Sequence, residues 1–275
     1  MCIRDRLTPE GYHIELSFPT DGTGYEVGAM ALIKGGKGPL LVVDADANSN
    51  LNEVLGVEAG VSLGQIREEI AQAELRGDTI PKSMTKADYA EYRFESALAE
   101  EDDFDMLVMG RTQGKGCYCY VNGVLKTLLD KYIGAYRYVV IDNEAGMEHI
   151  ARGTLPHVDA LLLVSDCSRR GVQAVARIAE MVRELDLKPG LMKLIINRAP
   201  GGVLSDGVRE EIEAHHLELA GVLPQDDAVY EADCDGKPSS KIPDASPVKQ
   251  ALHGIMQDLS LYCLLYTSDA ADDTP

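Results

Sequence analysis

The sequence predicts an α/β fold: a single domain built on a doubly wound, mainly parallel sheet that is flanked by helices. Three observations lead to this fold class. Apolar runs of strand length recur along the chain, and stretches with helical periodicity separate them. The 275 residues, 45% of them hydrophobic, are enough for one sizeable core, and no repeat or low-complexity linker divides them.

Six apolar runs are the predicted strands, and they are continuous in Val, Ile and Leu rather than alternating with polar residues. They are Pro39–Asp44, Phe104–Gly110, Tyr136–Asp142, Ala160–Asp166, Leu191–Arg198 and Leu219–Pro224. Continuous runs are typical of strands that are buried on both faces, as in a parallel sheet with crossover helices. The runs therefore predict a parallel sheet.

Two segments have the periodicity of helices that cover a sheet. Apolar residues recur at helical spacing in Gly171–Leu185, and Gly123–Tyr132 has a similar pattern. Residues 76–103 are polar and acidic and end in the run EEDD, so we expect a helical insertion or a surface loop there.

The two ends of the chain share a complementary DNA word when they are back-translated. Residues 1–6 (MCIRDR) can be written as ATG TGT ATA AGA GAC AGR. Residues 263–268 (CLLYTS) can be written as TGT CTC TTA TAC ACA TCT, the reverse complement of the first string extended upstream by AG. This word resembles the transposase adapter of sequencing libraries. We therefore expect residues 1–6 and 263–275 to be translated adapter, and residues 7–262 to form the domain.

Charge and cysteine content disfavour several function classes. With 45 acidic and 26 basic residues the net charge is −19, which argues against a nucleic-acid-binding surface. No apolar run approaches about 20 residues, so we predict no membrane span. Six cysteines are too few for a disulfide scaffold, and no signal peptide precedes the first strand. We therefore expect a cytoplasmic protein.

Polar residues stand at or just beyond the carboxyl ends of the predicted strands. They are Asp44, Asp46, Arg111, Asp142, Asp166, Asn197 and Asp226. An aspartate in such a place is commonly a helix N-cap. Ligands of open parallel sheets also bind at this edge, so the seven residues are predicted to converge on one site.

The segment Gly116–Tyr120 (GCYCY) contains the sharpest local motif. Cys117 and Cys119 point to the same side if the segment is extended, but two thiolates cannot complete a four-coordinate site. Two chains related by a two-fold axis can, and four sulfurs suit tetrahedral zinc or planar nickel. The alternative is a pair of buried or idle thiols. His215 and His216 lie in a polar, helix-like stretch, and we expect them to be solvated.

Two further motifs follow predicted strands. Tyr138–His149 (YVVIDNEAGMEH) looks like a Walker B segment, in which Asp142 holds magnesium through water. Leu41–Leu51 (LVVDADANSNL) ends a strand in paired aspartates followed by amides.

Together with Asn197–Arg198 and Leu223–Asp226 (LPQD), these motifs resemble the deviant-Walker ATPases of the nitrogenase-iron-protein/MinD class, which have a P-loop NTPase fold. Within that class the match is to the nickel-insertion accessory ATPases of carbon monoxide dehydrogenase and their acetyl-CoA synthase counterparts. The resemblance covers roughly residues 20–255, and the combination of DNEAGMEH with GCYCY is its most specific part.

The resemblance implies that the chain binds ATP and Mg²⁺. Asp46 would orient the attacking water, Asn50 would lie near the phosphates, and Asp142 would sit beside magnesium. Asn197, with Arg198 next to it, would read the adenine edge. Pro224 and Asp226 would flank the nucleoside.

The resemblance also implies a metallochaperone that works as a homodimer. Cys117 and Cys119 of both subunits would hold Ni²⁺, or Zn²⁺, when a nucleotide closes the dimer. Hydrolysis would release the metal to carbon monoxide dehydrogenase or acetyl-CoA synthase.

The phosphate loop departs from the family pattern GKGGxGKT[TS]. In Pro19–Val27 (PTDGTGYEV), only Gly22, Thr23 and Gly24 match, and Thr20 and Tyr25 stand where the two lysines belong. The lost charge predicts a poor ATPase, because those lysines offset the triphosphate. A sequence error near the adapter, a natural pseudo-enzyme and a fragment with another start would each account for this loop.

Two other functions compete with nickel insertion. A MinD/ParA-like positioning ATPase would need basic patches or a basic amphipathic tail, and residues 247–262 contain a single lysine. A redox protein like the nitrogenase iron protein needs a cysteine from each of two separated loops, and Cys167 and Cys234 do not fall at those places. A metal-binding pseudo-ATPase is the remaining alternative.

Overall fold

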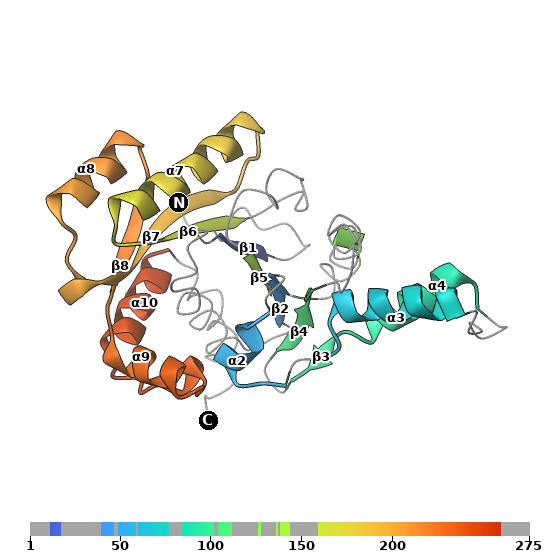
Figure 1. The fold of residues 1–275 in the computed structure, drawn as a ribbon. Coiled ribbons are helices and arrows are strands. Elements are labelled where there is room, and N and C mark those ends of the chain that lie inside the picture. Colours follow the sequence, from blue (N-terminus) through green and yellow to red (C-terminus); the bar gives the residue numbers. More distant parts are fainter. Residues whose placement is uncertain are drawn as a thin grey trace, which may run out of the picture.

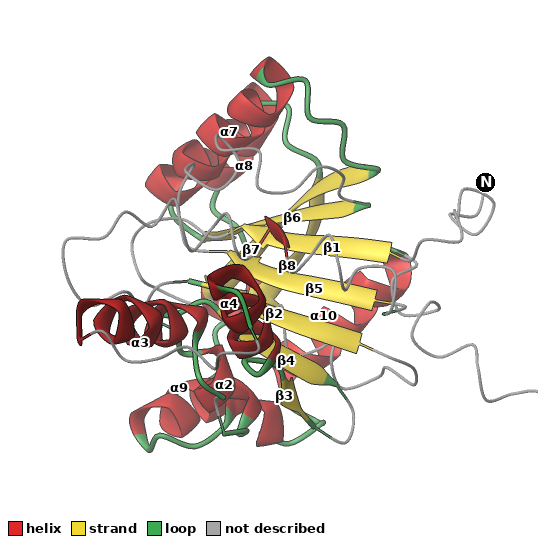
Figure 2. Ribbon diagram, turned by 90° about the vertical axis from the view of Figure 1, so that its right-hand side faces the viewer, coloured by secondary structure: helices red, strands yellow, loops and turns green. Residues whose placement is uncertain are grey.

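A computed structural model describes residues 12–17, 40–46, 49–58, 60–76, 84–101, 104–111, 126–127, 136, 138–143 and 159–259 of the chain. Their strands form one sheet in the order β3-β4-β2-β5-β1-β6-β7-β8 (Figure 2). The strands are β1 (Tyr12–Ser17), β2 (Leu40–Ala45), β3 (Ala99–Glu100), β4 (Asp105–Val108), β5 (Tyr138–Asn143), β6 (Ala160–Asp166), β7 (Leu191–Ala199) and β8 (Leu219–Pro224). Each pair of neighbours is parallel except β3 and β4, which confirms the predicted mainly parallel sheet.

Helices cover both faces of the sheet, as in a doubly wound fold (Figure 1). They are α2 (Leu51–Leu55), α3 (Leu63–Arg76), α4 (Lys86–Glu95), α7 (Arg169–Glu184), α8 (Asp206–Ala214), α9 (Asp227–Cys234) and α10 (Pro247–Asp258), with the 3₁₀ turns η3 (Pro200–Gly202) and η4 (Ser239–Lys241). In the described part of the chain, none of these helices has the length and apolar character needed to cross a bilayer.

Successive side chains of a strand point to opposite faces of the sheet, so the hydrophobic core has a part on each face. Leu40 and Val42 pack in one cluster with α2 and α10, whereas Leu41 and Val43 pack in another with α3 and α4. A third cluster joins α7 and α8 to β6 and β7. All six residues of β2 are buried, as expected for a strand covered on both sides.

The predicted helix over Gly171–Leu185 is observed as α7. Its N-cap is Ser168, whose hydroxyl accepts a hydrogen bond from the Gly171 N–H at 3.0 Å. Its apolar face is buried on the sheet. Helix α8 is joined to α7 through the buried carboxylate of Glu211. This carboxylate accepts hydrogen bonds from Arg169 Nη2 at 2.7 Å and from Gln173 Nε2 at 2.8 Å. Of the predicted helix at Gly123–Tyr132, only residues 126–127 are described, and they are helical.

Helices α3 and α4 form an arm that extends away from the rest of the domain (Figure 1). Within the polar stretch 76–103, residues 86–95 are helical as α4, and β3 follows α4. The base of the arm meets the end of β4 backbone to backbone. The Gly64 N–H donates to the Met109 carbonyl at 2.9 Å, and a Cβ on Gly64 would lie 2.4 Å from the Arg111 carbonyl oxygen.

Candidate nucleotide site at the carboxyl edge of the sheet

The strand register brings several predicted site residues together at the carboxyl edge. Asp44 at the end of β2 pairs in register with Asp142 of β5. Farther along, Asp166 of β6 pairs with Asn197 of β7, and Pro224 of β8 pairs with Ala199. Residues far apart in sequence therefore lie along one edge of the sheet.

Asp44 is 1% exposed, and both of its carboxylate oxygens accept hydrogen bonds from backbone N–H groups that follow it in the chain. Oδ1 accepts from the Asp46 N–H at 3.0 Å, and Oδ2 accepts from the Leu51 N–H at 3.1 Å. Desolvation by burial raises the pKa of Asp44 to about 6, although these two hydrogen bonds act in the opposite direction. Asp44 thus closes the segment 44–51 into a loop, a role that its place after a strand did not reveal.

Asp46 and Asn50, the predicted water-orienting and phosphate-side residues, are both partly exposed on that loop. The Ser49 hydroxyl donates to the Asp46 carbonyl at 2.9 Å, and Ser49 itself has a left-handed φ of 52°. Asn50 is the N-cap residue of α2, but its side chain makes no capping hydrogen bond. The hydrogen bonds of Asp44 and Ser49 therefore join the described ends of this segment, where Asp46 is partly exposed.

Asp142 is the next-to-last residue of β5, which lies between β2 and β1. It is 7% exposed, and the following Asn143 is 6% exposed. In register it has Asp44 on one side and Leu16 of β1 on the other. A carboxylate oxygen is the kind of protein ligand that Mg²⁺ prefers, and Asp142 is the carboxylate at this point of the edge whose oxygens are not both taken by the loop after β2.

Asn197 and Arg198 end the regular part of β7. Asn197 is 2% exposed, and its Oδ1 accepts a hydrogen bond from the Arg198 N–H at 2.9 Å. Arg198 is exposed and has a left-handed φ of 54°. Beside them on β6, Asp166 accepts from both the backbone N–H (3.0 Å) and the hydroxyl (2.7 Å) of Ser168, and so supports the N-cap of α7.

Asp226 is the N-cap residue of α9, and it also accepts hydrogen bonds from residues at the start of α10. Its Oδ1 accepts from the Ala228 N–H at 2.9 Å, and its Oδ2 accepts from the Ser246 hydroxyl and the Val248 N–H. Desolvation raises the pKa of Asp226, but the three hydrogen bonds outweigh it and the net pKa is lowered. Asp226 therefore has a clear structural role, and Pro224 lies two residues before it, at the end of β8.

Five predicted site residues lie outside the described residues: Gly22, Thr23, Gly24, Cys117 and Cys119. Their roles, and those of the residues described above, stay predictions. Within the described ranges, no group of three or more His, Cys, Asp or Glu side chains is placed to hold a metal ion. Cys167 is partly exposed and Cys234 exposed, and both are free thiols.

The doubly wound sheet and its polar carboxyl edge define an α/β protein of the nucleotide-binding class. Residues 29–239 match the family described as the CobQ/CobB/MinD/ParA nucleotide-binding domain. An uncharacterized ATP-binding protein of Methanocaldococcus jannaschii is 38% identical over 222 residues, which are 80% of this chain and 86% of that protein. The chain belongs to the CobQ/CobB/MinD/ParA nucleotide-binding domain family.

More distant relatives agree with this family and confirm the fold. The carbon monoxide dehydrogenase accessory protein CooC of Rhodospirillum rubrum is 28% identical over 72% of this chain and 76% of its own length. Among solved structures, a ParA family ATPase from Chlorobium tepidum aligns over 92% of this chain and 99% of its own, with TM-score 0.66 and 18% identity. MinD from Pyrococcus horikoshii, solved with Mg-ADP, aligns over 90% and 96%, with TM-score 0.63 and 19% identity. The fold is that of a MinD/ParA-like P-loop NTPase.

Proposed function

We propose that this protein binds ATP with Mg²⁺ at the carboxyl edge of the sheet. The observation that carries the proposal is the register that sets Asp142 beside Asp44, with Asp46 on the loop that Asp44 closes. In this proposal Asp142 holds magnesium through water, and Asp46 orients the water that attacks the γ-phosphate. Asn197, Arg198, Pro224 and Asp226 lie at the same edge, where they would bind the nucleoside.

Mg²⁺ would supply the charge that draws electrons from the transferred phosphoryl group. The residues fit this ion, since carboxylate oxygens are its preferred protein ligands. Asp44 does not compete for it, because both of its oxygens accept backbone hydrogen bonds. The chain's own residues hold the loop, orient the water and bind the base.

The nucleotide proposal extends to a metal cargo. We infer that two subunits close around ATP and that Cys117 and Cys119 of each hold one Ni²⁺, or Zn²⁺, between them. The cysteine pair and the similarity to CooC support this inference. The client would be carbon monoxide dehydrogenase or acetyl-CoA synthase, and the thiols would stay reduced in the cytoplasm.

A positioning ATPase of the MinD/ParA type is the second candidate, because the solved relatives are of that type. Such a protein needs a free cationic or amphipathic surface for its target. Helix α10 does not offer one: its apolar residues Val248, Leu252 and Met256 are buried in the core. Its Lys249 bonds the carbonyls of Ser240 and Ile242.

Metal titration of the full chain under reducing, anaerobic conditions tests the metallochaperone proposal. With ATP present we expect one Ni²⁺ per two chains and a dimer by light scattering, because each chain supplies two thiolates. The variant with both Cys117→Ser and Cys119→Ser should lose this stoichiometry. Its matched control, Cys167→Ser with Cys234→Ser, should keep it. Equal nickel binding by the first variant and the wild type would refute the cysteine site.

Restoring the phosphate loop tests the ATPase proposal separately. Replacing the stretch from residue 19 onward by the family pattern GKGGTGKTT should raise ATP turnover at least about 100-fold, since the lysines stabilise the transition-state charge. Adding Asp46→Asn to that variant should lower turnover again while ATP binding persists. Turnover by the unaltered chain at the same rate as the restored variant would show that the loop is assigned wrongly.

A further inference from the structure

The two halves of the candidate nucleotide site lie on strands that are not neighbours in the sheet. The phosphate half, with Asp46 and Asn50, follows β2, whereas the nucleoside half, with Pro224 and Asp226, lies at the end of β8 and just beyond it. Five strand spacings of about 4.8 Å separate β2 from β8, or roughly 24 Å measured along the sheet. Binding of one ligand across both halves therefore depends on how their spacing is fixed.

Helix α2 begins directly after the phosphate half. Asn50 is its N-cap residue, and the Asn50 carbonyl accepts a hydrogen bond from the Glu53 N–H at 3.1 Å. The N–H of Leu51, the first residue of α2, donates to Asp44. The three buried side chains of α2 lie in the same core cluster as α10. A movement of α2 would therefore move Asn50 with it.

The other end of α2 lies against η4, the turn between α9 and α10. Helix α2 lies beside α9 in both views (Figure 1 and Figure 2). Gly56 ends α2 with a φ of 72°, and a Cβ on Gly56 would lie 2.5 Å from Cγ of Pro238. The Ser240 hydroxyl donates to the Leu55 carbonyl at 3.1 Å. This bond satisfies one of the carbonyls that the end of a helix leaves without a helical partner.

Lys249 joins η4 to α10. Its Nζ donates to the Ser240 carbonyl at 3.0 Å, to the Ile242 carbonyl, and to Asp244 Oδ1 at 3.3 Å. The side chain of Lys249 is 13% exposed, so these hydrogen bonds are largely shielded from water. Ser240 thus accepts from Lys249 through its carbonyl and donates to α2 through its hydroxyl.

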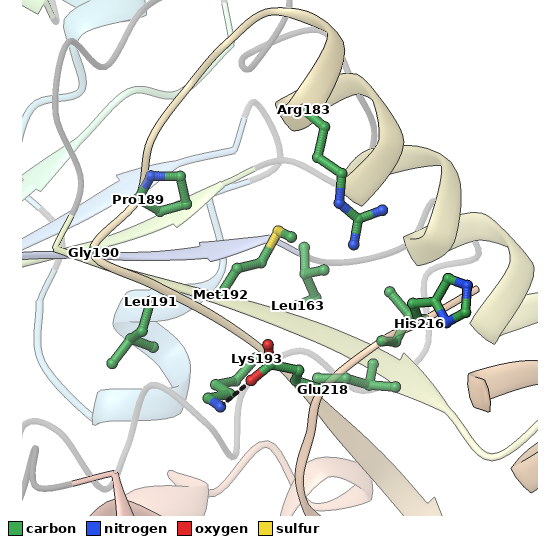
Figure 3. A pocket seen from close by; sticks show the side chains of 11 residues that line it. Leu163, Arg183, Pro189, Gly190, Leu191, Met192, Lys193, His216 and Glu218 are labelled. Atoms are coloured by element: carbon green, nitrogen blue, oxygen red, sulfur yellow. Dashed lines mark hydrogen bonds and ion pairs between the residues drawn. The ribbon is translucent and has the colours of Figure 1, made fainter. Parts of the chain in front are cut away.

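Two other lysines use their charge differently. Lys193 pairs with the Glu218 carboxylate, beside a cavity near the amino ends of β7 and β8 (Figure 3). Lys237 pairs with Asp235, and both of these side chains are more than half exposed. Exposed ion pairs contribute little to stability. The ammonium of Lys249 instead lies among backbone carbonyls with little access to water, where charge-assisted hydrogen bonds are strong.

The same part of α10 is also bonded to the nucleoside half. The Val248 N–H donates to Asp226 Oδ2 at 3.3 Å, and Lys249 is the next residue. Hydrogen bonds therefore lead from Asp226 through Lys249 and Ser240 to Leu55 at the end of α2. We call this series the α2–α10 connection. It joins the two halves of the site on one face of the sheet.

We propose that Lys249 and Ser240 are positioning residues of the nucleotide site, which fix the spacing between its phosphate half and its nucleoside half. The proposal rests on the ATP binding proposed above. Lys249 acts through Ser240, and Ser240 acts through Leu55. We therefore expect both residues to affect the binding of a ligand that reaches both halves, and not the binding of a ligand that occupies the nucleoside half alone.

Binding of Mg-ATP and of adenosine to the full chain tests this role, because ATP extends over both halves and adenosine over one. Lys249→Met keeps a long side chain without the ammonium, and it should weaken Mg-ATP binding about tenfold in isothermal titration calorimetry. Adenosine binding should stay unchanged. Ser240→Ala removes a single hydroxyl and should give the same split between the two ligands. Equal weakening of both ligands, or no change in either, would overturn the positioning role.

Two matched variants control for the loss of charge and of a hydroxyl. Lys237→Met removes an equal charge from an exposed ion pair in the loop before η4. Ser205→Ala removes an exposed hydroxyl that makes no capping hydrogen bond. Neither variant should alter Mg-ATP binding. If Lys237→Met weakened it as much as Lys249→Met, overall charge would be the cause and the role of Lys249 would be refuted.

Amide hydrogen exchange without nucleotide separates a failure of this role from a failure of ATP binding. In Lys249→Met the Leu51 amide should exchange about tenfold faster, because α2 loses its support at η4. The Val172 amide of α7 should keep its wild-type rate. Faster exchange at Leu51, together with no binding of either ligand to the wild type, would refute the nucleotide site but not the α2–α10 connection. Unchanged exchange at Leu51 would refute the connection itself.

Discussion

Two aspartates at the same edge of the sheet show how different environments set the charge of one residue type. Asp44 lies near the end of β2, is almost fully buried and accepts two backbone hydrogen bonds. Asp226 follows β8, is partly exposed and accepts three hydrogen bonds, one of them from a hydroxyl. Desolvation prevails at Asp44 and raises its pKa to about 6, whereas the donors prevail at Asp226 and lower its pKa.

The comparison shows that a polar residue at the end of a strand can stabilise the fold through hydrogen bonds while it also lies at the candidate nucleotide site. Asp226 joins the first turns of α9 and α10, and Asp44 joins the two ends of the loop that carries Asp46. The two residues should therefore respond in opposite ways when their charge is removed.

Asp226→Ala should have the largest effect. The variant loses three hydrogen bonds to a carboxylate, including the N-cap of α9, and we expect the free energy of unfolding to fall by about 4 kcal/mol. Urea denaturation measures it. The neighbouring exposed Asp227→Ala is the control and should cost under about 1 kcal/mol. Equal effects at both positions would mean that the three bonds do not form.

Asp44→Asn should change the pH dependence of stability. The folded-state pKa is raised from 3.8 to about 6, so the folded protein binds more protons than the unfolded chain between these values. Its free energy of unfolding therefore falls by up to about 3 kcal/mol as pH rises from 4 to 7, and the variant lacks this term. The advantage of wild type over Asp44→Asn should shrink over that range in urea denaturation.

Asp226→Asn provides the contrast in the same pH series. Its folded-state pKa is lowered, so the carboxylate stabilises the fold above the unfolded pKa, and this contribution is lost as pH falls through the folded pKa. The advantage of wild type over Asp226→Asn should therefore decrease on acidification below about pH 4. The same sign for both aspartates would contradict the comparison.

Ser168→Ala should have the smallest effect of these substitutions. Ser168 caps α7 through its hydroxyl, which Asp166 orients, and its loss should cost about 1 kcal/mol in thermal or urea unfolding. Ser205 precedes α8 in the same position without a capping hydrogen bond, so Ser205→Ala should cost close to nothing. A similar cost for both serines would show that the hydroxyl of Ser168 does not act as a cap.

The sheet was predictable where strands are buried on both faces. The six continuous apolar runs correspond to β2, β4, β5, β6, β7 and β8. The strand β1 was not among them, because Tyr12–Ser17 (YHIELS) alternates polar and apolar residues, and the two-residue β3 is too short to leave a pattern. The register could not be read from the sequence, yet it is what places Asp44 beside Asp142.

The sequence predicted which residues of the candidate site lie at one edge of the sheet. It did not predict which of them make structural hydrogen bonds. The sequence marks Asp44 and Asp226 only as polar residues after strands. Their hydrogen bonds depend on Leu51, Ser246 and Val248, which lie seven to 22 residues away. The partly buried bond between Glu211 and Arg169 joins two helices through residues that are 42 positions apart, and it has no local signal.

The glycine contact at the base of the α3–α4 arm has a mechanical consequence. Because Gly64 has no side chain, the backbone of α3 lies directly against the carbonyl of Arg111, beyond the end of β4. Arg111 leads directly into the segment of the chain that contains Cys117 and Cys119. Gly64→Ala would place a Cβ 2.4 Å from that carbonyl oxygen, so α3 and the chain after β4 would have to move apart.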